Sequence, residues 1–242
     1  MKLLIRQMSV GLLGAMAIYA QGRGGPPRSP KDGAPIDLTG YWVSVVTEDW
    51  RFRMVTPPKG DFPDVALNDA GKAIANAWDP AKDEAAGNAC KGYGAGALMR
   101  VPSRFRFTWE DDNTLKLESD AGTQTRLLHF GEAKPSGAPS LQGYSVATWE
   151  RAHGRGNPGG SLKVVTTNLA SGYLQKNGVP YSEQATVTEY FDIVKEPDGE
   201  QWLIAKMLVD DPKYLTRTYI ASPNLKKQAD AKGWNPTACT VR

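Results

Sequence analysis

The sequence contains few of the residues from which most metal, thiol and histidine sites are built. Its 242 residues include two cysteines and two histidines. They form no CxxC pair and no HExxH or His-x-His pattern, so we predict neither a metal site nor a cofactor. No G-x-S-x-G motif surrounds a serine, which leaves nucleophilic serine chemistry without support.

The chain also lacks an excess of charge of one sign. Its 29 basic and 26 acidic residues give a formal net charge of +3, and loss of Lys2 and Arg6 with an N-terminal signal would reduce this to +1. The sequence has no block dense in lysine and arginine and no stacking-aromatic motif. These absences exclude the usual signatures of nucleic-acid binding, so we predict no nucleic-acid partner.

Long apolar runs are missing except near the N-terminus. Residues 8–20 form a short apolar run that follows Lys2 and Arg6 and ends in small residues. This pattern predicts a signal peptide over residues 1–20, with an uncleaved anchor as the alternative. The glycine- and proline-rich residues 21–36 predict a flexible lead-in, and 37–242 a single domain. We therefore expect an exported protein, periplasmic or secreted, with no membrane span after cleavage.

Cys90 and Cys239 are the two cysteines, and an even count in an exported protein favours a disulfide. The bond would tie the C-terminal tail to the middle of the chain. On the chain-entropy model, closing so long a loop contributes roughly 3 to 5 kcal/mol. Free or metal-binding thiols are the alternative, but no cysteine spacing supports them.

Hydrophobic alternation predicts many short strands separated by turns, together with one helix over 68–78. The spacing favours a mainly β fold, an antiparallel barrel or sandwich. Residues 79–96 are predicted to be loop and 173–181 a connection. The predicted strands cover 41–47, 50–55, 104–110, 114–118, 124–130, 141–150, 162–169, 214–222 and two strands within 185–209.

The segment 185–209 carries the most specific chemical pattern, two strands joined by a polar loop. If Ile193 lies opposite Trp202, Glu189 faces Lys206 in an otherwise apolar stripe. A carboxylate on such a face is costly to desolvate unless it is paired. A structural ion pair is one interpretation. The other is a catalytic pair in an internal cavity, with Glu189 as acid or base and Lys206 setting its pKa.

Several further polar and aromatic residues on the predicted strands could contact a ligand or substrate. His129 could act as a general base or ligand, although a core or surface histidine is the simpler interpretation. His153, in a glycine-rich loop, is expected to be solvated. The candidate ligand contacts, which are equally ordinary rim residues, are Arg100, Arg126, Tyr144, Glu150, Trp109, Tyr181 and Trp202.

Five segments resemble motifs that recur, in the same order, in a group of uncharacterised exported bacterial β-rich proteins. They are SLQGYSVATWE (140–150), VVTTN (164–168), GVPYSEQATVTEYF (178–191), VDDPKYL (209–215) and WNPTAC (234–239). The resemblance spans residues 37–239. It implies an exported location and a lipocalin-like fold, and it brings no assigned activity or catalytic residue.

Three functional hypotheses follow from these observations. The first is an exported barrel that binds a small, partly apolar or aromatic ligand in an internal cavity. The second is a cofactor-independent acid–base enzyme, a lyase, isomerase or hydrolase, that uses Glu189. The third is a structural module whose interior is filled by aromatic side chains. The sequence does not predict the oligomeric state.

Overall fold

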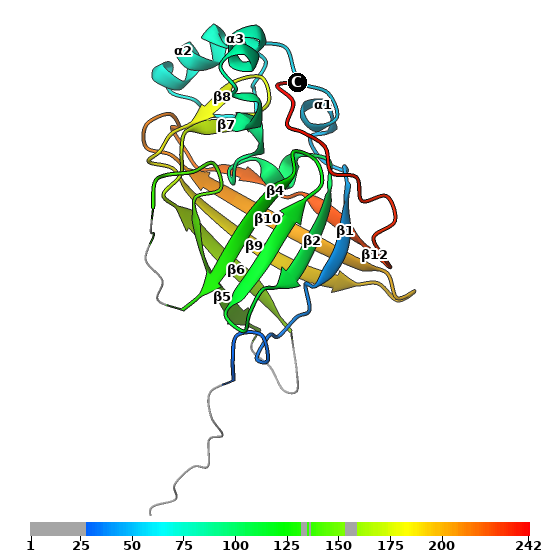
Figure 1. The fold of residues 1–242 in the computed structure, drawn as a ribbon. Coiled ribbons are helices and arrows are strands. Elements are labelled where there is room, and N and C mark those ends of the chain that lie inside the picture. Colours follow the sequence, from blue (N-terminus) through cyan, green and yellow to red (C-terminus); the bar gives the residue numbers. More distant parts are fainter. Residues whose placement is uncertain (1–27, 132–134, 136, 153–158) are drawn as a thin grey trace, which may run out of the picture.

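The computed structural model describes residues 28–131, 135, 137–152 and 159–242. The predicted signal peptide and His153 therefore lie outside the described residues. Among those residues, nine strands close into a β-barrel in the order β10–β12–β1–β2–β3–β4–β5–β6–β9, with β9 pairing back to β10 (Figure 1). The fold is mainly β, as predicted.

The barrel strands are β1 (Gly40–Val45), β2 (Arg104–Trp109), β3 (Thr114–Ser119), β4 (Gln124–Phe130), β5 (Tyr144–Arg151), β6 (Gly160–Thr167), β9 (Thr186–Lys195), β10 (Gln201–Asp210) and β12 (Asn224–Gln228). Their pairings are antiparallel except for β4 and β5, which pair in parallel over three residues. A short strand, β11 (Tyr219–Ala221), pairs with the far half of β10.

Alternation along the strands fills the barrel interior with large side chains. Phe105 and Phe107 of β2 point inward and are fully buried, as their spacing predicts, and so are Trp42 and Phe191. The Phe107 and Phe191 rings meet edge to face with centroids 5.8 Å apart. The interior of this barrel is therefore a packed core.

The end of the barrel drawn uppermost in Figure 1, here the upper end, carries the helices and a small hairpin. The helices are α1 (Trp50–Arg53), α2 (Asp69–Ala77) and α3 (Pro80–Ala85), with the 3₁₀ turns η1 (Ala89–Tyr93) and η2 (Leu98–Arg100). The hairpin consists of β7 (Gly172–Gln175) and β8 (Val179–Tyr181). Its turn needs Gly178, because φ is 84° there and a Cβ atom would lie 2.2 Å from the Trp78 ring.

Four local predictions need correction. Residues 50–55 do not form a strand, because Asp49 adopts a left-handed conformation (φ 49°) that turns the chain into α1, leaving Trp50 68% exposed. The predicted loop 79–96 contains α3, whose Asp79 cap and Pro80 are a standard helix start. The predicted connection 173–181 is the β7–β8 hairpin, and the predicted strand 214–222 is reduced to β11, with β12 following it in the tail.

The helix predicted over 68–78 is confirmed as α2, and its N-cap gives a direct test. The Asn68 side chain accepts from the Gly71 N–H at 2.9 Å and donates to the Lys213 carbonyl at 2.9 Å. We expect Asn68→Ala to lower the free energy of unfolding by about 1 to 2 kcal/mol, measured by urea denaturation. Asn68→Asp keeps the capping oxygen, so it should cost less; equal losses in both variants would contradict the capping role.

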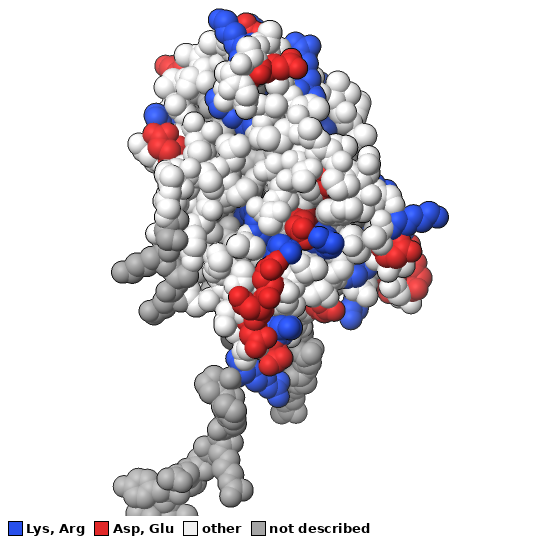
Figure 2. Space-filling view, in the orientation of Figure 1, with Lys and Arg blue, Asp and Glu red and all other residues white. Residues whose placement is uncertain are grey.

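The C-terminal tail and the segment before β1 are each held at one end of the barrel. The disulfide between Cys90 and Cys239 is present, with Cα atoms 5.1 Å apart, and fixes the tail to η1. Residues 28–36, part of the predicted flexible lead-in, cross the lower end of the barrel, where the Trp149 indole donates to the Pro30 carbonyl at 2.8 Å (Figure 1). On the face shown in Figure 2, charged side chains of both signs lie at the upper end and along a stripe that runs from the middle of the face to the lower end.

Candidate functional site

A buried ion pair lies inside the barrel, between Arg126 of β4 and Glu189 of β9. The guanidinium donates twice to the carboxylate, from Nη1 to Oε1 at 3.0 Å and from Nη2 to Oε2 at 2.6 Å. Arg126 is 2% exposed and Glu189 is fully buried. Two parallel hydrogen bonds of this kind are the strongest form of carboxylate pairing in proteins.

The same guanidinium joins the two strands that lie between its own strand and that of Glu189. Arg126 Nη2 contacts Thr166 Oγ1 of β6 at 3.0 Å and Ser145 Oγ of β5 at 3.4 Å, and these two hydroxyls lie 2.8 Å apart. Arg126 therefore bridges the short parallel seam between β4 and β5. Sequence reasoning missed Ser145 and Thr166, although each is a small polar residue on an inward-facing position.

Tyr181 of β8 lies at the upper side of this pair. Within the described part of the chain, its hydroxyl and Arg126 Nε are buried without a hydrogen-bond partner. Burial raises the pKa of Tyr181, and the charge of Arg126 opposes that rise only in part, so the phenol stays neutral. Three predicted candidates, Arg126, Glu189 and Tyr181, therefore lie buried in the same part of the barrel, although Tyr181 was predicted to be a ligand contact at a strand end.

The predicted pairing of Glu189 with Lys206 is wrong. Glu189 lies opposite Met207, and Lys206 lies opposite Tyr190 on the outer face, where its ammonium sits 4.8 Å from the Tyr190 ring centre. The cause is a slip of one residue in register, because Lys195 rather than Val194 pairs with Gln201. A one-residue slip sends every side chain of the strand to the other face.

The other predicted candidates are spread over the molecule. His129 stacks on Tyr144 on the outer face, with centroids 4.9 Å apart. Glu150 makes an exposed ion pair with Lys163 at 3.7 Å, and the Trp202 ring lies 5.9 Å from the Lys226 ammonium. Arg100 lies at the upper end and Trp109 at the lower end, and each belongs to a cavity.

The cavity at the upper end, here the arginine pocket, is lined by residues of α1, η2 and β7. Its volume is about 30 Å³, and its polar wall is formed by Arg53, Arg100, Gln175 and Lys176. The Arg53 side chain is 1% exposed and the Arg100 side chain 4%. Arg53 Nε donates to the Arg100 carbonyl at 2.8 Å, and Arg100 Nη1 donates to the Leu174 carbonyl at 3.1 Å.

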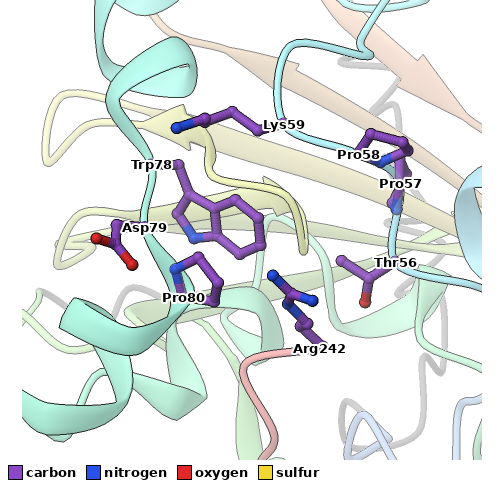
Figure 3. A pocket seen from close by; sticks show the side chains of 8 residues that line it. All are labelled: Thr56, Pro57, Pro58, Lys59, Trp78, Asp79, Pro80 and Arg242. Atoms are coloured by element: carbon purple, nitrogen blue, oxygen red, sulfur yellow. The ribbon is translucent and has the colours of Figure 1, made fainter.

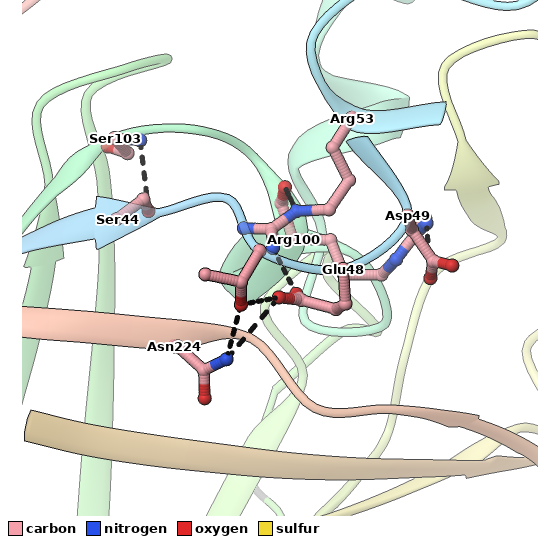
Figure 4. Close-up of polar contacts among 8 residues, drawn as sticks. Ser44, Glu48, Asp49, Arg53, Arg100, Ser103 and Asn224 are labelled. Carbon is pink, nitrogen blue, oxygen red and sulfur yellow. Dashed lines mark hydrogen bonds and ion pairs between the residues drawn. The ribbon is translucent and has the colours of Figure 1, made fainter. Parts of the chain in front are cut away.

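Two carboxylates reach these arginines from the loop after β1. Glu48 pairs with Arg53, and Asp49 lies 3.5 Å from Arg100 Nη2 (Figure 4). Burial lowers the pKa of Arg53, Glu48 opposes this effect, and the charge of Arg100 adds to it. The two buried cations therefore repel each other in a poorly solvated space. Sequence reasoning missed Arg53, because residues 50–55 were predicted to form a strand and in fact contain α1.

The cavity at the lower end, here the lower pocket, is lined by two tryptophans, by aliphatic side chains and by the charged residues Lys31 and Asp37. Its volume is about 350 Å³, and Trp109, Trp149 and Ile36 form walls above core residues Leu38 and Leu115. Phe130 lies between the two tryptophans, with ring centroids 5.5 Å from Trp109 and 5.4 Å from Trp149. Lys31 also lines the pocket and lies 3.7 Å from Asp112.

A third cavity, of about 390 Å³, lies on the outside of the upper end (Figure 3). Loop residues Pro57 and Pro58 face the Trp78 ring across it, and Arg242 lies 6.0 Å from that ring. The Trp78 indole nitrogen donates to Asp83 at 3.0 Å. Trp78 is its one aromatic wall and its ring already lies near a guanidinium, whereas two tryptophans line the lower pocket.

The described residues contain no group of three histidine, cysteine, aspartate or glutamate side chains placed to hold a metal ion. In the same part of the chain, no helix is both long enough and apolar enough to span a membrane. Comparison of the chain with family models, with curated proteins and with solved structures returned no match. The functional interpretation is therefore based on the geometry of the three cavities.

Proposed function

We propose that the protein binds a small, partly apolar or aromatic molecule in the lower pocket. The observation that carries this proposal is the pair of tryptophans, Trp109 and Trp149, lining a 350 Å³ cavity whose floor is the barrel core. Cavities of about 300 to 1,000 Å³ with apolar walls and few polar groups are typical ligand sites. Lys31 and Asp37, which also line the cavity, supply polar contacts.

The lower pocket fits this role better than the barrel interior does. Trp42, Phe105, Phe107 and Phe191 fill the interior and are fully buried. At the lower end, by contrast, Trp109 and Trp149 are only partly buried and pack against that core from outside. An aromatic ligand could therefore stack on them without displacing a core side chain.

The acid–base hypothesis stays a prediction. Both Glu189 oxygens already accept from Arg126, and Glu189, Arg126 and Lys206 line none of the three cavities described above.

We also propose that the protein acts outside the cytoplasm. The Cys90–Cys239 disulfide supports this location, since such bonds persist in oxidising compartments.

Binding of N-phenyl-1-naphthylamine, a neutral aromatic dye, tests the proposal. We expect one dye per chain, detected by its fluorescence, and binding about tenfold weaker in Trp109→Ala because a stacking wall is lost. Trp109→Phe should retain most of the affinity, which separates stacking from a folding defect. Trp50→Ala is the matched control, because Trp50 is 68% exposed and lies at the upper end.

Two outcomes would overturn this proposal. The wild-type protein could fail to bind the dye. Alternatively, Trp109→Ala and Trp50→Ala could bind it as tightly as the wild type does.

A further inference from the structure

The arginine pocket contains more unused hydrogen-bonding capacity than its size suggests. Arg53 Nη2 and Arg100 Nε are buried N–H donors, and neither has a partner among the described residues. Both side chains line the same cavity. Buried polar groups in native proteins are nearly always satisfied, so this set of unpartnered atoms requires an occupant.

The charge on the cavity wall favours an anion over water as that occupant. Three lining side chains, Arg53, Arg100 and Lys176, are cationic, and no carboxylate lines the cavity. Glu48 and Asp49 contact the arginines from the loop side and do not line it. A water molecule would satisfy the donors, but a carboxylate would make charge-assisted hydrogen bonds to two guanidiniums that Glu48 and Asp49 contact from the loop side.

We propose that the arginine pocket is a second binding site, for the carboxylate group of a small organic acid. A guanidinium fork matches a planar carboxylate with parallel N–H···O bonds. A volume of about 30 Å³ admits a small head group and little more. Phe52 and Leu174, which also line the cavity, would contact a short apolar chain. This site is independent of the lower pocket.

Acetate is the probe, titrated against sodium chloride at constant ionic strength. Arginine side-chain N–H resonances followed by NMR give the readout. We expect the Arg100 Nε–H resonance to shift and saturate with acetate and not with chloride. Arg53→Lys keeps the charge but loses the fork, so acetate should bind about tenfold more weakly. Arg51→Lys is the matched control, because Arg51 is on the same helix, does not line the cavity and is 59% exposed.

A second variant keeps the test valid if Arg53→Lys does not fold. Lys176→Met removes one charge from the wall and should weaken acetate binding about threefold. The proposal is overturned if acetate and chloride move the Arg100 resonance equally, or if acetate does not move it; the cavity then holds water only. It is also overturned if folded Arg53→Lys binds acetate as the wild type does. The neutral dye reports on the lower pocket alone, so the two proposals fail independently.

Discussion

Replacing Glu189 with glutamine should lower the free energy of unfolding by about 3 to 5 kcal/mol. The carboxylate is fully buried, and each of its two oxygens accepts a hydrogen bond from Arg126. Glutamine keeps the shape but removes the charge, so the Arg126 guanidinium is left buried and uncompensated. Urea denaturation monitored by circular dichroism measures the loss.

Two matched variants show whether the loss of stability comes from breaking the Arg126–Glu189 ion pair or would follow from any similar substitution. Glu150→Gln removes a carboxylate from an exposed pair with Lys163 on neighbouring strands and should cost no more than about 1 kcal/mol. The double variant Arg126→Met with Glu189→Leu removes both charges and should recover most of the stability. The Ser145–Thr166 hydrogen bond can persist without Arg126. A Glu189→Gln loss as small as that of Glu150→Gln would contradict the structural role of the ion pair.

Removing the disulfide should have an effect of similar size. Cys90 and Cys239 are separated by 149 residues, and on the chain-entropy model a loop of that length contributes about 5 kcal/mol. We expect the double variant Cys90→Ala with Cys239→Ala to unfold at a much lower urea concentration than the oxidised wild type. Reduced wild-type protein should match the double variant.

Local contacts of the tail give a second readout of the same change. Thr240 contacts the Tyr93 hydroxyl at 3.1 Å and the Lys176 ammonium at 2.8 Å, next to the disulfide. Amide hydrogen exchange over 235–242 should therefore rise once the bond is removed. If the urea midpoint of the double variant equals that of the oxidised protein, the disulfide does not stabilise the fold.

The features that could be predicted from sequence are those encoded locally. Alternation placed Phe105 and Phe107 inward, and Asn68 before an alanine-rich run marked the start of α2. The disulfide was predicted from two cysteines in a chain that was itself predicted to be exported. None of these inferences required knowledge of which strands are neighbours.

The features that were missed depend on tertiary geometry. The β9–β10 register is set by the conformation of the connecting loop, and a slip of one residue exchanged Lys206 for Met207 on the inner face. Arg126 is 63 residues from Glu189 and meets it only because β4 and β9 belong to one closed barrel. The barrel is closed through β12, a polar strand of which Leu225 alone is fully buried.

The central claim is that ligands enter at the lower end of the barrel and stack on Trp109 and Trp149. A crystal structure of the protein with bound N-phenyl-1-naphthylamine tests it most directly. We predict that the dye lies against the two indole rings, above Leu38 and Leu115, with the Arg126–Glu189 pair unchanged. Dye bound inside the barrel beside Glu189, or bound elsewhere with the lower pocket empty, would contradict the claim.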